Sequence, residues 1–391
     1  MKCKCIGAAV LAAAIVLSGC AESKESAEIA LEARSTRDTS ALTSSVAPVQ
    51  STSAAVSFPE VSSDAASSFD TQPECSMPEM PQEVTSSVIS DDTSVTEIPQ
   101  LLEREIVGMN ETRTVSSGET LDVESGKMLQ VIGTLIIESG ATLNVASGAE
   151  LLIEGSVQLG GDIVLSEGGK LSMGSDTAMI DGSGSVIVKD DFEQIDCERG
   201  TIKAHIIPPE RVVTNGVTRV GGVVIANKAI KLPPEFGSHL SLNEVEPEVY
   251  AALEEMSADA GHWYVNRSGY RSYWDQQSAF QSNVDLFGFE RADMLSSRAG
   301  HSEHQTGLTM DLDSFDQNYG TTPDGKWLAD NCWRYGFIIR YPKGKEHITG
   351  YDYEPWHVRY LGKSTAKLVF DSGLTLEEFL NVEGGTVVID D

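Results

Sequence analysis

The sequence reads SGETLDVESG at residues 117–126 and SGATLNVASG at residues 139–148, and a looser copy follows at residues 160–169. The period of about 22 residues lies in the range of parallel β-helices. Each of the first two copies holds three pairs of apolar residues at strand spacing, so the side chains of a pair share one face of a short strand. The pairs are Leu121/Val123, Leu129/Val131 and Leu135/Ile137 in the first copy, and Leu143/Val145, Leu151/Ile153 and Val157/Leu159 in the second. Stacked coils with glycine-containing corners would bury these pairs, which predicts a parallel β-helix-like solenoid over residues 107–205.

The predicted solenoid carries no cluster of catalytic residue types, and it holds no histidine before His205. The simplest interpretation is a rigid spacer or an oligomerisation platform. A saccharide-binding or wall-binding surface is the alternative, to which no residue points specifically.

The N-terminus has the pattern of a bacterial lipoprotein signal. A short basic head precedes an apolar run at residues 6–17, which is too short to span a bilayer as a permanent helix. The next residues, Ser18-Gly19-Cys20, resemble a lipobox, in which the cysteine is lipidated and becomes the mature N-terminus. An ordinary secretory signal with a chance cysteine is the alternative. We expect a signal peptide over residues 1–19 and an extracytoplasmic protein that lipid on Cys20 anchors to the bacterial cell membrane.

Charge and composition bound the rest of the chain. Acidic residues outnumber basic ones 59 to 28, and the formal net charge of -31 argues against nucleic acid as a partner. Residues 20–106 are rich in Ser, Thr, Ala, Glu and Pro and nearly lack aromatic residues, which predicts a disordered tether. Three cysteines remain besides Cys20 and those of the signal, namely Cys75, Cys197 and Cys332, which predicts free or buried thiols rather than a disulfide framework.

Beyond the repeats, histidines and aromatic residues appear, and helical and extended patterns alternate without regular βαβ order. This predicts an α+β domain over residues 206–391, with a core at about 218–380. Pro247 suits the first position of a helix to Ala258. Ser272 followed by Asp275 resembles a capping box, which predicts a helix that runs to about Phe287. We also expect an extended segment at residues 263–265, a helix at 323–335 and a strand at 337–340.

Four residues of this domain have the types that a catalytic zinc site requires. Such a site has three protein ligands, an open fourth position and a nearby base. His304, Asp311 and His357 can be the ligands. Seven extended residues would separate His304 from Asp311 by roughly 23 Å, so the chain must turn between them, and Gly307 permits a turn.

Glu354 can be the base of this site. Pro355 disfavours helical backbone at Glu354, so Glu354 and His357 stand at a turn or a strand entry, where two side chains three apart can converge. A surface acid beside a core histidine is the alternative. Arg271 lies where an extended segment is expected to end and a helix to begin, so its guanidinium and the first helical N–H groups could face one anion. A structural arginine paired with a surface acid is the alternative there.

Five motifs follow one another in this region. They are Ser268-Gly269-Tyr270-Arg271-Ser272, Ser302-Glu303-His304-Gln305-Thr306-Gly307, Gly336-Phe337-Ile338-Ile339-Arg340-Tyr341-Pro342, Ile348-Thr349-Gly350-Tyr351 and Glu354-Pro355-Trp356-His357-Val358-Arg359-Tyr360. In kind and order they resemble the VanY-type D-alanyl-D-alanine carboxypeptidases, over roughly residues 221–379. Two positions depart from the family pattern: Thr309 stands where alanine is usual, and Ala299-Gly300 stands where Pro-Gly is common.

The resemblance implies roles for individual residues. It implies Zn²⁺ bound by His304, Asp311 and His357, with Glu354 as the general base. It also implies that Arg271 polarises the scissile carbonyl and steadies the oxyanion. The residues that would help to grip the terminal carboxylate of the substrate are Gln276, Ser297 and Ser302.

The function that we expect is that of a zinc-dependent carboxypeptidase, which removes the C-terminal D-alanine from peptidoglycan stem peptides. An L,D-carboxypeptidase that acts on tetrapeptide stems is an alternative. A D-Ala-D-Ala dipeptidase is disfavoured because it works on a cytoplasmic dipeptide, whereas this chain carries an export signal. The alternative from another class is a surface wall-binding protein that acts through its solenoid and has an inactive peptidase-like domain.

Overall fold

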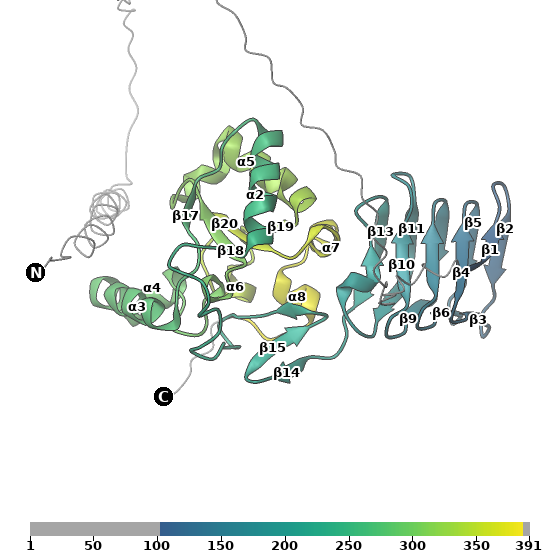
Figure 1. Cartoon of the computed structure of the whole chain (residues 1–391), viewed down its shortest axis with the longest axis horizontal. Coiled ribbons are helices and arrows are strands. Elements are labelled where there is room, and N and C mark those ends of the chain that lie inside the picture. The colour runs from purple at the N-terminus through teal and green to yellow at the C-terminus, as the bar shows by residue number, and fades with distance from the viewer. Residues whose placement is uncertain (1–101, 386–391) are drawn as a thin grey trace, which may run out of the picture. The chain divides into compact units, whose positions relative to one another are not determined.

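The structure is a computed structural model, and it describes residues 102–385 (Figure 1). These residues belong to one compact unit of the chain, residues 91–391. The predicted signal peptide, Cys20, Cys75 and the tether up to residue 101 lie outside the described residues. Within residues 102–385, no helix combines the length and the apolar character that a membrane crossing requires.

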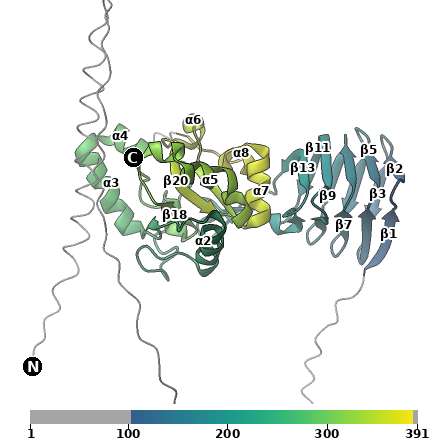
Figure 2. The ribbon, with the colours of Figure 1, turned by 90° about the horizontal axis from the view of Figure 1, so that it is seen from above.

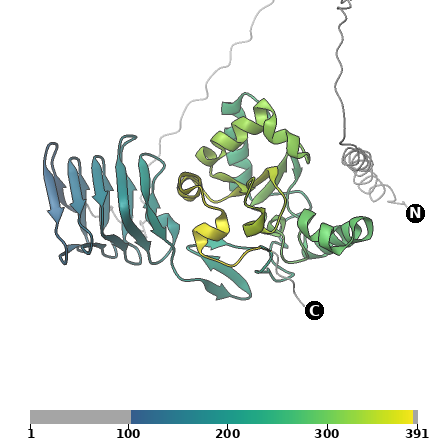
Figure 3. The same ribbon diagram turned by 180° about the vertical axis from the view of Figure 1, so that it is seen from behind.

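Residues 103–207 form the predicted β-solenoid, whose strands stack in parallel (Figures 1 and 3). The first sheet stacks β1 (Glu103–Val107), β4 (Lys127–Val131), β7 (Glu150–Ile153), β10 (Lys170–Met173) and β12 (Ile195–Asp196). The second sheet has the order β2 (Thr112–Val115), β5 (Thr134–Ile137), β8 (Ser156–Leu159), β11 (Met179–Val188), β9 (Asp162–Leu165), β6 (Thr142–Val145) and β3 (Thr120–Val123), and β13 (Thr201–Ile207) pairs with β11. The long strand β11 joins two columns, because its first residues pair with β8 and its last with β9.

The apolar pairs of the repeats fill the interior of the solenoid. Eleven of the twelve residues predicted to point inward are buried, and Leu121 is partly buried against the same core. Like residues stack on one another: Leu121 lies opposite Leu143, and Leu129 lies opposite Leu151. Burying one such side chain contributes about 1.5–3 kcal/mol, so the interior is the main source of stability of this region.

The corners depend on glycine at specific positions. Gly140 has a φ of 80°, in the left-handed region that glycine adopts without strain. Gly155 is required for another reason, since a Cβ atom there would lie 2.2 Å from the carbonyl oxygen of Gly133 in the coil before. The coils can therefore stack closely only where the corner has no side chain.

The solenoid differs from the prediction in two ways. Strand β1 begins at Glu103, so the predicted tether over residues 20–106 is wrong for its last residues, which pair with β4. The third copy is also shorter: Thr120 pairs with Thr142, 22 residues on, whereas Thr142 pairs with Asp162, 20 residues on. The chain takes up the difference at a corner, since residues 138–141 separate β5 from β6 whereas only residues 160–161 separate β8 from β9.

The second part of the described chain is the predicted α+β domain. A small sheet comprises β14 (Val212–Thr214), β15 (Val217–Val220) and β16 (Val223–Val224). The main sheet is antiparallel, in the order β17 (Asn266–Ser268), β18 (Thr309–Leu312), β20 (Glu354–Tyr360) and β19 (Phe337–Tyr341). The helices are α2 (Pro247–Ala260), α3 (Tyr273–Phe287), α4 (Phe289–Leu295), α5 (Pro323–Asn331), α6 (Glu346–Thr349), α7 (Lys363–Ser372) and α8 (Leu376–Leu380), with 3₁₀ turns η1 (Phe192–Gln194), η2 (Glu303–Thr306), η3 (Gln317–Thr321) and η4 (Cys332–Tyr335).

The local signals for helices are confirmed. Pro247 opens α2, and the Ser272 side chain caps α3 by accepting from the backbone N–H of Asp275. The helix predicted at residues 323–335 consists of α5 followed by η4. The segment predicted to be extended at residues 263–265 leads directly into strand β17.

The C-terminal helices α7 and α8 pack against the last coil of the solenoid (Figure 2). The rings of Phe192 and Phe379 lie 5.2 Å apart, and the backbone N–H of Cys197 donates to the Ser364 hydroxyl at 3.2 Å. Cys197 and Cys332 are free and buried, as predicted for these two, and burial raises the pKa of both thiols to about 12. Neither is thus present as a reactive thiolate at neutral pH.

Candidate active site

Antiparallel pairing of β18 with β20 brings Asp311 opposite His357. One Asp311 carboxylate oxygen lies 3.0 Å from His357 Nδ1, and the other lies 3.2 Å from Nε2 of His304. His304 reaches this position from η2, which ends at Gly307 with a φ of 71°. The turn expected between His304 and Asp311 is therefore present, and the carboxylate stands between the two imidazoles.

These three residues fit a zinc ion. One ligand atom from each of His304, Asp311 and His357 lies within 4.8 Å of the other two, and all three residues are buried. His304 Nδ1 donates to the Gly269 carbonyl at 2.8 Å, which leaves the lone pair of Nε2 directed to the site. Two imidazoles and one carboxylate are a donor set of catalytic zinc sites, which leave a fourth position open.

Glu354 lies beside the ligands at the first position of β20. Its carboxylate is 3.3 Å from His357 Nδ1, and its side chain is largely buried. Burial raises the pKa of Glu354 above its ordinary value, even though the neighbouring His357 lowers it. A carboxylate with a raised pKa next to a metal ligand is what a general base near neutral pH requires.

The acids around His357 control its charge when no cation is bound. Burial lowers the pKa of His357, but hydrogen bonds to Asp311 and Glu354 outweigh burial and raise it to about 9. Burial raises the pKa of Asp311, but His304 and His357 outweigh it and hold the pKa below its ordinary range. The site thus has the electrostatics of a cation site, in which a proton takes the place of the metal.

Arg271 stands at the junction of β17 and α3, and its backbone N–H donates to the His304 carbonyl at 3.2 Å. Its guanidinium donates to the Gln276 amide oxygen at 2.8 Å and to the Ser268 hydroxyl at 2.9 Å. Both acceptors are neutral, so the alternative of a surface acid as its partner is wrong for the described residues. The positive charge of Arg271 is therefore free to stabilise an anion.

The three residues expected to grip the substrate lie around Arg271 and His304. Gln276 is buried, and besides accepting from Arg271 it donates to the Ser297 carbonyl at 2.5 Å. The Ser297 hydroxyl accepts from the Tyr351 hydroxyl at 2.8 Å. Ser302 is buried directly before η2. Gln276 holds Arg271 in place, and direct contact of Gln276, Ser297 or Ser302 with substrate remains a prediction.

Sequence reasoning assigned no role to Tyr341 and Tyr351, which lie inside the motifs, or to Lys228, which precedes them. The Tyr341 ring is 4.7 Å from the ring of His357 and 4.5 Å from that of Tyr351. The buried Lys228 ammonium lies 3.8 Å above the Tyr351 ring. The available signal for Tyr341 was an aromatic residue at the end of the otherwise mostly apolar strand β19, which does not reveal its partner in space.

Comparison with known proteins agrees with this geometry. Residues 242–363 match the family model of VanY D-alanyl-D-alanine carboxypeptidases. The chain is 31% identical over 153 residues to the bifunctional D-Ala-D-Ala dipeptidase and D-Ala-D-Ala carboxypeptidase VanXYC of Enterococcus gallinarum, which covers 37% of this chain and 80% of that protein. The chain belongs to the VanY family. Its likeness to YodJ of Bacillus subtilis (strain 168), a carboxypeptidase by name, is higher, with 43% identity over 183 residues, but spans 40% of this chain and 66% of that relative.

Solved structures include relatives of this VanY-family protein. An L,D-carboxypeptidase, DacB from Streptococcus pneumoniae, is 36% identical, covers 46% of this chain and 99% of its own, and superposes with a TM-score of 0.39. A mutant of the D,D-pentapeptidase VanY from a VanB-type resistance cassette, in complex with Zn(II), is 30% identical, covers 40% of this chain and 97% of its own, and gives a TM-score of 0.36. The segment that matches the family model, residues 242–363, contains the candidate site and leaves out the solenoid.

Proposed function

We propose that this VanY-family protein is a zinc-dependent D,D-carboxypeptidase, which removes the C-terminal D-alanine from peptidoglycan stem peptides. The observation that carries the proposal is the convergence of His304, Asp311 and His357, with the Glu354 carboxylate 3.3 Å from His357. Three ligands and a separate base are the components of a hydrolytic zinc site.

The residues of the site can divide the reaction among them. Zinc held by His304, Asp311 and His357 would supply a Lewis acid that polarises the scissile carbonyl and activates water. Glu354 takes the proton of the attacking water and returns it to the nitrogen of the departing D-alanine. Arg271 donates to the oxygen on which negative charge develops, because its guanidinium has only neutral partners.

An L,D-carboxypeptidase is the second candidate. The relative DacB from Streptococcus pneumoniae is described as an L,D-carboxypeptidase and shares 36% identity with this chain. The same ligands, base and arginine would serve that reaction, since both reactions hydrolyse an amide bond and release D-alanine, and they differ in the residue that precedes the scissile bond. The two activities are therefore separated by the substrate rather than by the metal site.

The test uses the protein from residue 21 onward, incubated with a pentapeptide stem that ends in D-Ala-D-Ala and, separately, with a tetrapeptide stem. We expect release of one D-alanine from the pentapeptide and none when a chelator is present. Release from the tetrapeptide alone would establish the L,D-carboxypeptidase. No release from either stem by zinc-loaded protein would contradict an enzyme and favour a wall-binding protein that acts through its solenoid.

We further propose that the protein works outside the cell membrane, anchored by lipid on Cys20. The support is the sequence of the first 20 residues and a substrate that lies outside the membrane. The test is growth with a labelled fatty acid. Label on the protein that is lost in Cys20→Ala, together with release of that variant from the membrane fraction, is the expected result; label retained in Cys20→Ala would contradict the proposal.

A further inference from the structure

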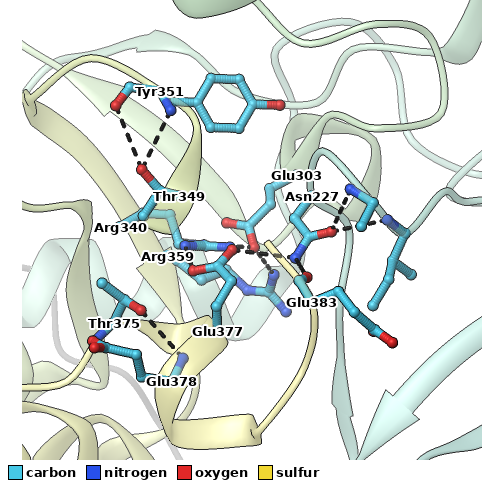
Figure 4. A network of polar contacts seen from close by, with 12 residues as sticks. Asn227, Glu303, Arg340, Thr349, Tyr351, Arg359, Thr375, Glu377, Glu378 and Glu383 are labelled. Atoms are coloured by element: carbon cyan, nitrogen blue, oxygen red, sulfur yellow. Dashed lines mark hydrogen bonds and ion pairs between the residues drawn. The ribbon is translucent and has the colours of Figure 1, made fainter. Parts of the chain in front are cut away.

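Figure 4 shows a buried network of charged side chains that come from four separate elements, η2, β19, β20 and α8. One oxygen of Glu303 accepts from Arg340 Nε at 2.9 Å and from Arg359 Nη1 at 2.8 Å. Arg340 also donates two hydrogen bonds to the carboxylate of Glu377, at 2.9 and 2.5 Å. The four side chains are at most 1% exposed.

The network contains equal numbers of positive and negative charges, and further hydrogen bonds fix its two ends. Two carboxylates face two guanidinium groups, and the paired bonds of Arg340 to Glu377 fix the plane of the guanidinium. Arg359 Nη2 donates to the Val224 carbonyl at 2.7 Å, and the Asn227 amide donates to the Glu377 carboxylate at 3.3 Å. The network therefore joins η2, β19, β20 and α8 to the segment after β15.

The network is adjacent to both ligand histidines along the chain. Glu303 immediately precedes His304 in η2, and Arg359 lies two residues after His357, on the same face of β20. The 2.8 Å contact between Glu303 and Arg359 thus ties the turn that carries one ligand to the strand that carries the other. The rings of His304 and His357 lie 5.1 Å apart, next to the contact between Glu303 and Arg359 along both chain segments.

Stability alone does not explain such a network. Removing two pairs of charges from water costs about as much free energy as their attraction returns, and apolar residues of similar volume often stabilise a core as well. What the charged network does supply is fixed geometry, since each arginine fork accepts its partners in one orientation. Geometry matters most at a metal site, where neighbouring contacts orient the ligands.

We propose that Glu303 is a positioning residue of the zinc site, which holds His304 in register with His357 through its bonds to Arg340 and Arg359. The inference rests on the proposed zinc enzyme and deepens it. It also extends the peptidase unit, because Val224, Asn227 and Glu377 lie outside the 242–363 segment that matches the family. The functional domain thus requires α8 and the strand pair before residue 225.

The test measures zinc affinity by competition with a chromogenic chelator, together with kcat, KM and the Tm of metal-free protein. In Glu303→Gln we expect the zinc dissociation constant to rise about 10- to 100-fold, with a fall in kcat and little change in KM. Glu377→Gln is the matched variant, because it breaks the same network at the end that does not touch η2. We expect it to lower Tm as Glu303→Gln does while it leaves zinc affinity close to that of the unmutated protein.

Each outcome decides the proposal. Unchanged zinc affinity in Glu303→Gln, or equal weakening in Glu303→Gln and Glu377→Gln, would show that the network only supports the fold. If Glu303→Gln does not fold, Glu303→Asp takes its place, since it keeps the charge and withdraws it from the arginines, and the same loss of zinc affinity is expected. Glu255→Gln, in an exposed pair with Lys363, is the control for a lost surface charge. Failure of the unmutated protein to bind zinc would instead contradict the proposed function.

Discussion

Asp311 and His357 face each other across β18 and β20, and one carboxylate oxygen of Asp311 lies 3.0 Å from His357 Nδ1. The second oxygen lies 3.2 Å from His304 Nε2, so a single carboxylate contacts both imidazoles. Cross-strand pairing places Asp311 and His357 without help from a loop. The site is therefore built on rigid elements on one side, and only η2, with His304, has to be brought to them.

Replacing Glu354 by glutamine should separate zinc binding from catalysis. Glutamine keeps the shape of the side chain but cannot accept the proton of the attacking water. We expect zinc content near that of the unmutated protein and a kcat lower by about 10²–10⁴-fold. Zinc measured by plasma emission and D-alanine release from the pentapeptide check this. Substantial residual turnover in Glu354→Gln would remove Glu354 as the base.

The pH dependence of the metal-free protein should report on His357. Its pKa is raised from 6.5 to about 9, against the effect of burial, by Asp311 and Glu354. A raised pKa stabilises the fold fully below the unfolded pKa of 6.5, and this contribution is lost as the pH rises through about 9. We expect the Tm of metal-free protein to fall across that window. Zinc affinity should rise across the same window, because zinc must displace the proton. A Tm of the metal-free protein that stays constant from pH 6.5 to about pH 9 would contradict this assignment.

Thr309 offers a test of the departure from the family pattern. Its side chain is fully buried on β18, two residues before Asp311, and its hydroxyl finds no hydrogen-bond partner within residues 102–385. An unpaired buried hydroxyl costs about 1–3 kcal/mol, so Thr309→Val, which keeps the shape, should raise Tm by several degrees. Thr309→Ala should gain less, since it leaves a small cavity. Thermal unfolding of both variants checks the order, and a lower Tm for Thr309→Val would show that the hydroxyl is bonded.

Tyr351 is linked to Arg271 by a chain of hydrogen bonds. Its hydroxyl donates to Ser297, whose carbonyl accepts from Gln276, which in turn accepts from Arg271. Tyr351→Phe removes only the hydroxyl, so we expect kcat/KM to fall about 2- to 10-fold, the worth of one hydrogen bond, with zinc affinity unchanged. Tyr250→Phe, at an exposed position of α2, is the control and should have no effect. Equal kcat/KM for Tyr351→Phe and the unmutated protein would show that this chain of bonds does not reach Arg271.

The corner glycines of the solenoid should matter for stability and not for catalysis. A methyl group at Gly155 would meet the carbonyl oxygens of Ile132 and Gly133 at 2.2 Å. We expect Gly155→Ala to lower Tm and to leave kcat/KM on a soluble pentapeptide unchanged. Calorimetric unfolding and the D-alanine assay measure the two effects. A loss of activity in folded Gly155→Ala would show that the solenoid contributes to the site.

The elements that sequence predicted well are those with local causes. The period of the repeats determines which side chains point inward, so burial of the apolar pairs followed from the sequence alone. The caps of α2 and α3 involve residues within one turn, as at Ser272 and Asp275.

The contacts that sequence could not predict join distant residues. The ion pair of Glu303 with Arg359 spans 56 residues, and that of Arg340 with Glu377 spans 37. An acid beside a candidate ligand histidine looks the same in sequence whether it is exposed or buried. The resemblance to the VanY family pointed to the candidate ligands, but the partners of Glu303 depend on how four elements meet, which no local pattern records.

Each coil of the solenoid adds little length along the stacking axis for the number of residues that it contains. One coil of about 22 residues, if extended, would reach roughly 70 Å, whereas stacked on its neighbour it adds about 4.8 Å. The residues between β1 and β13 therefore span a short distance but form a stiff rod, because the strands of each coil are hydrogen-bonded to those of the coil before. A solenoid of this kind restricts the orientation of an attached domain much more than it extends the reach of that domain.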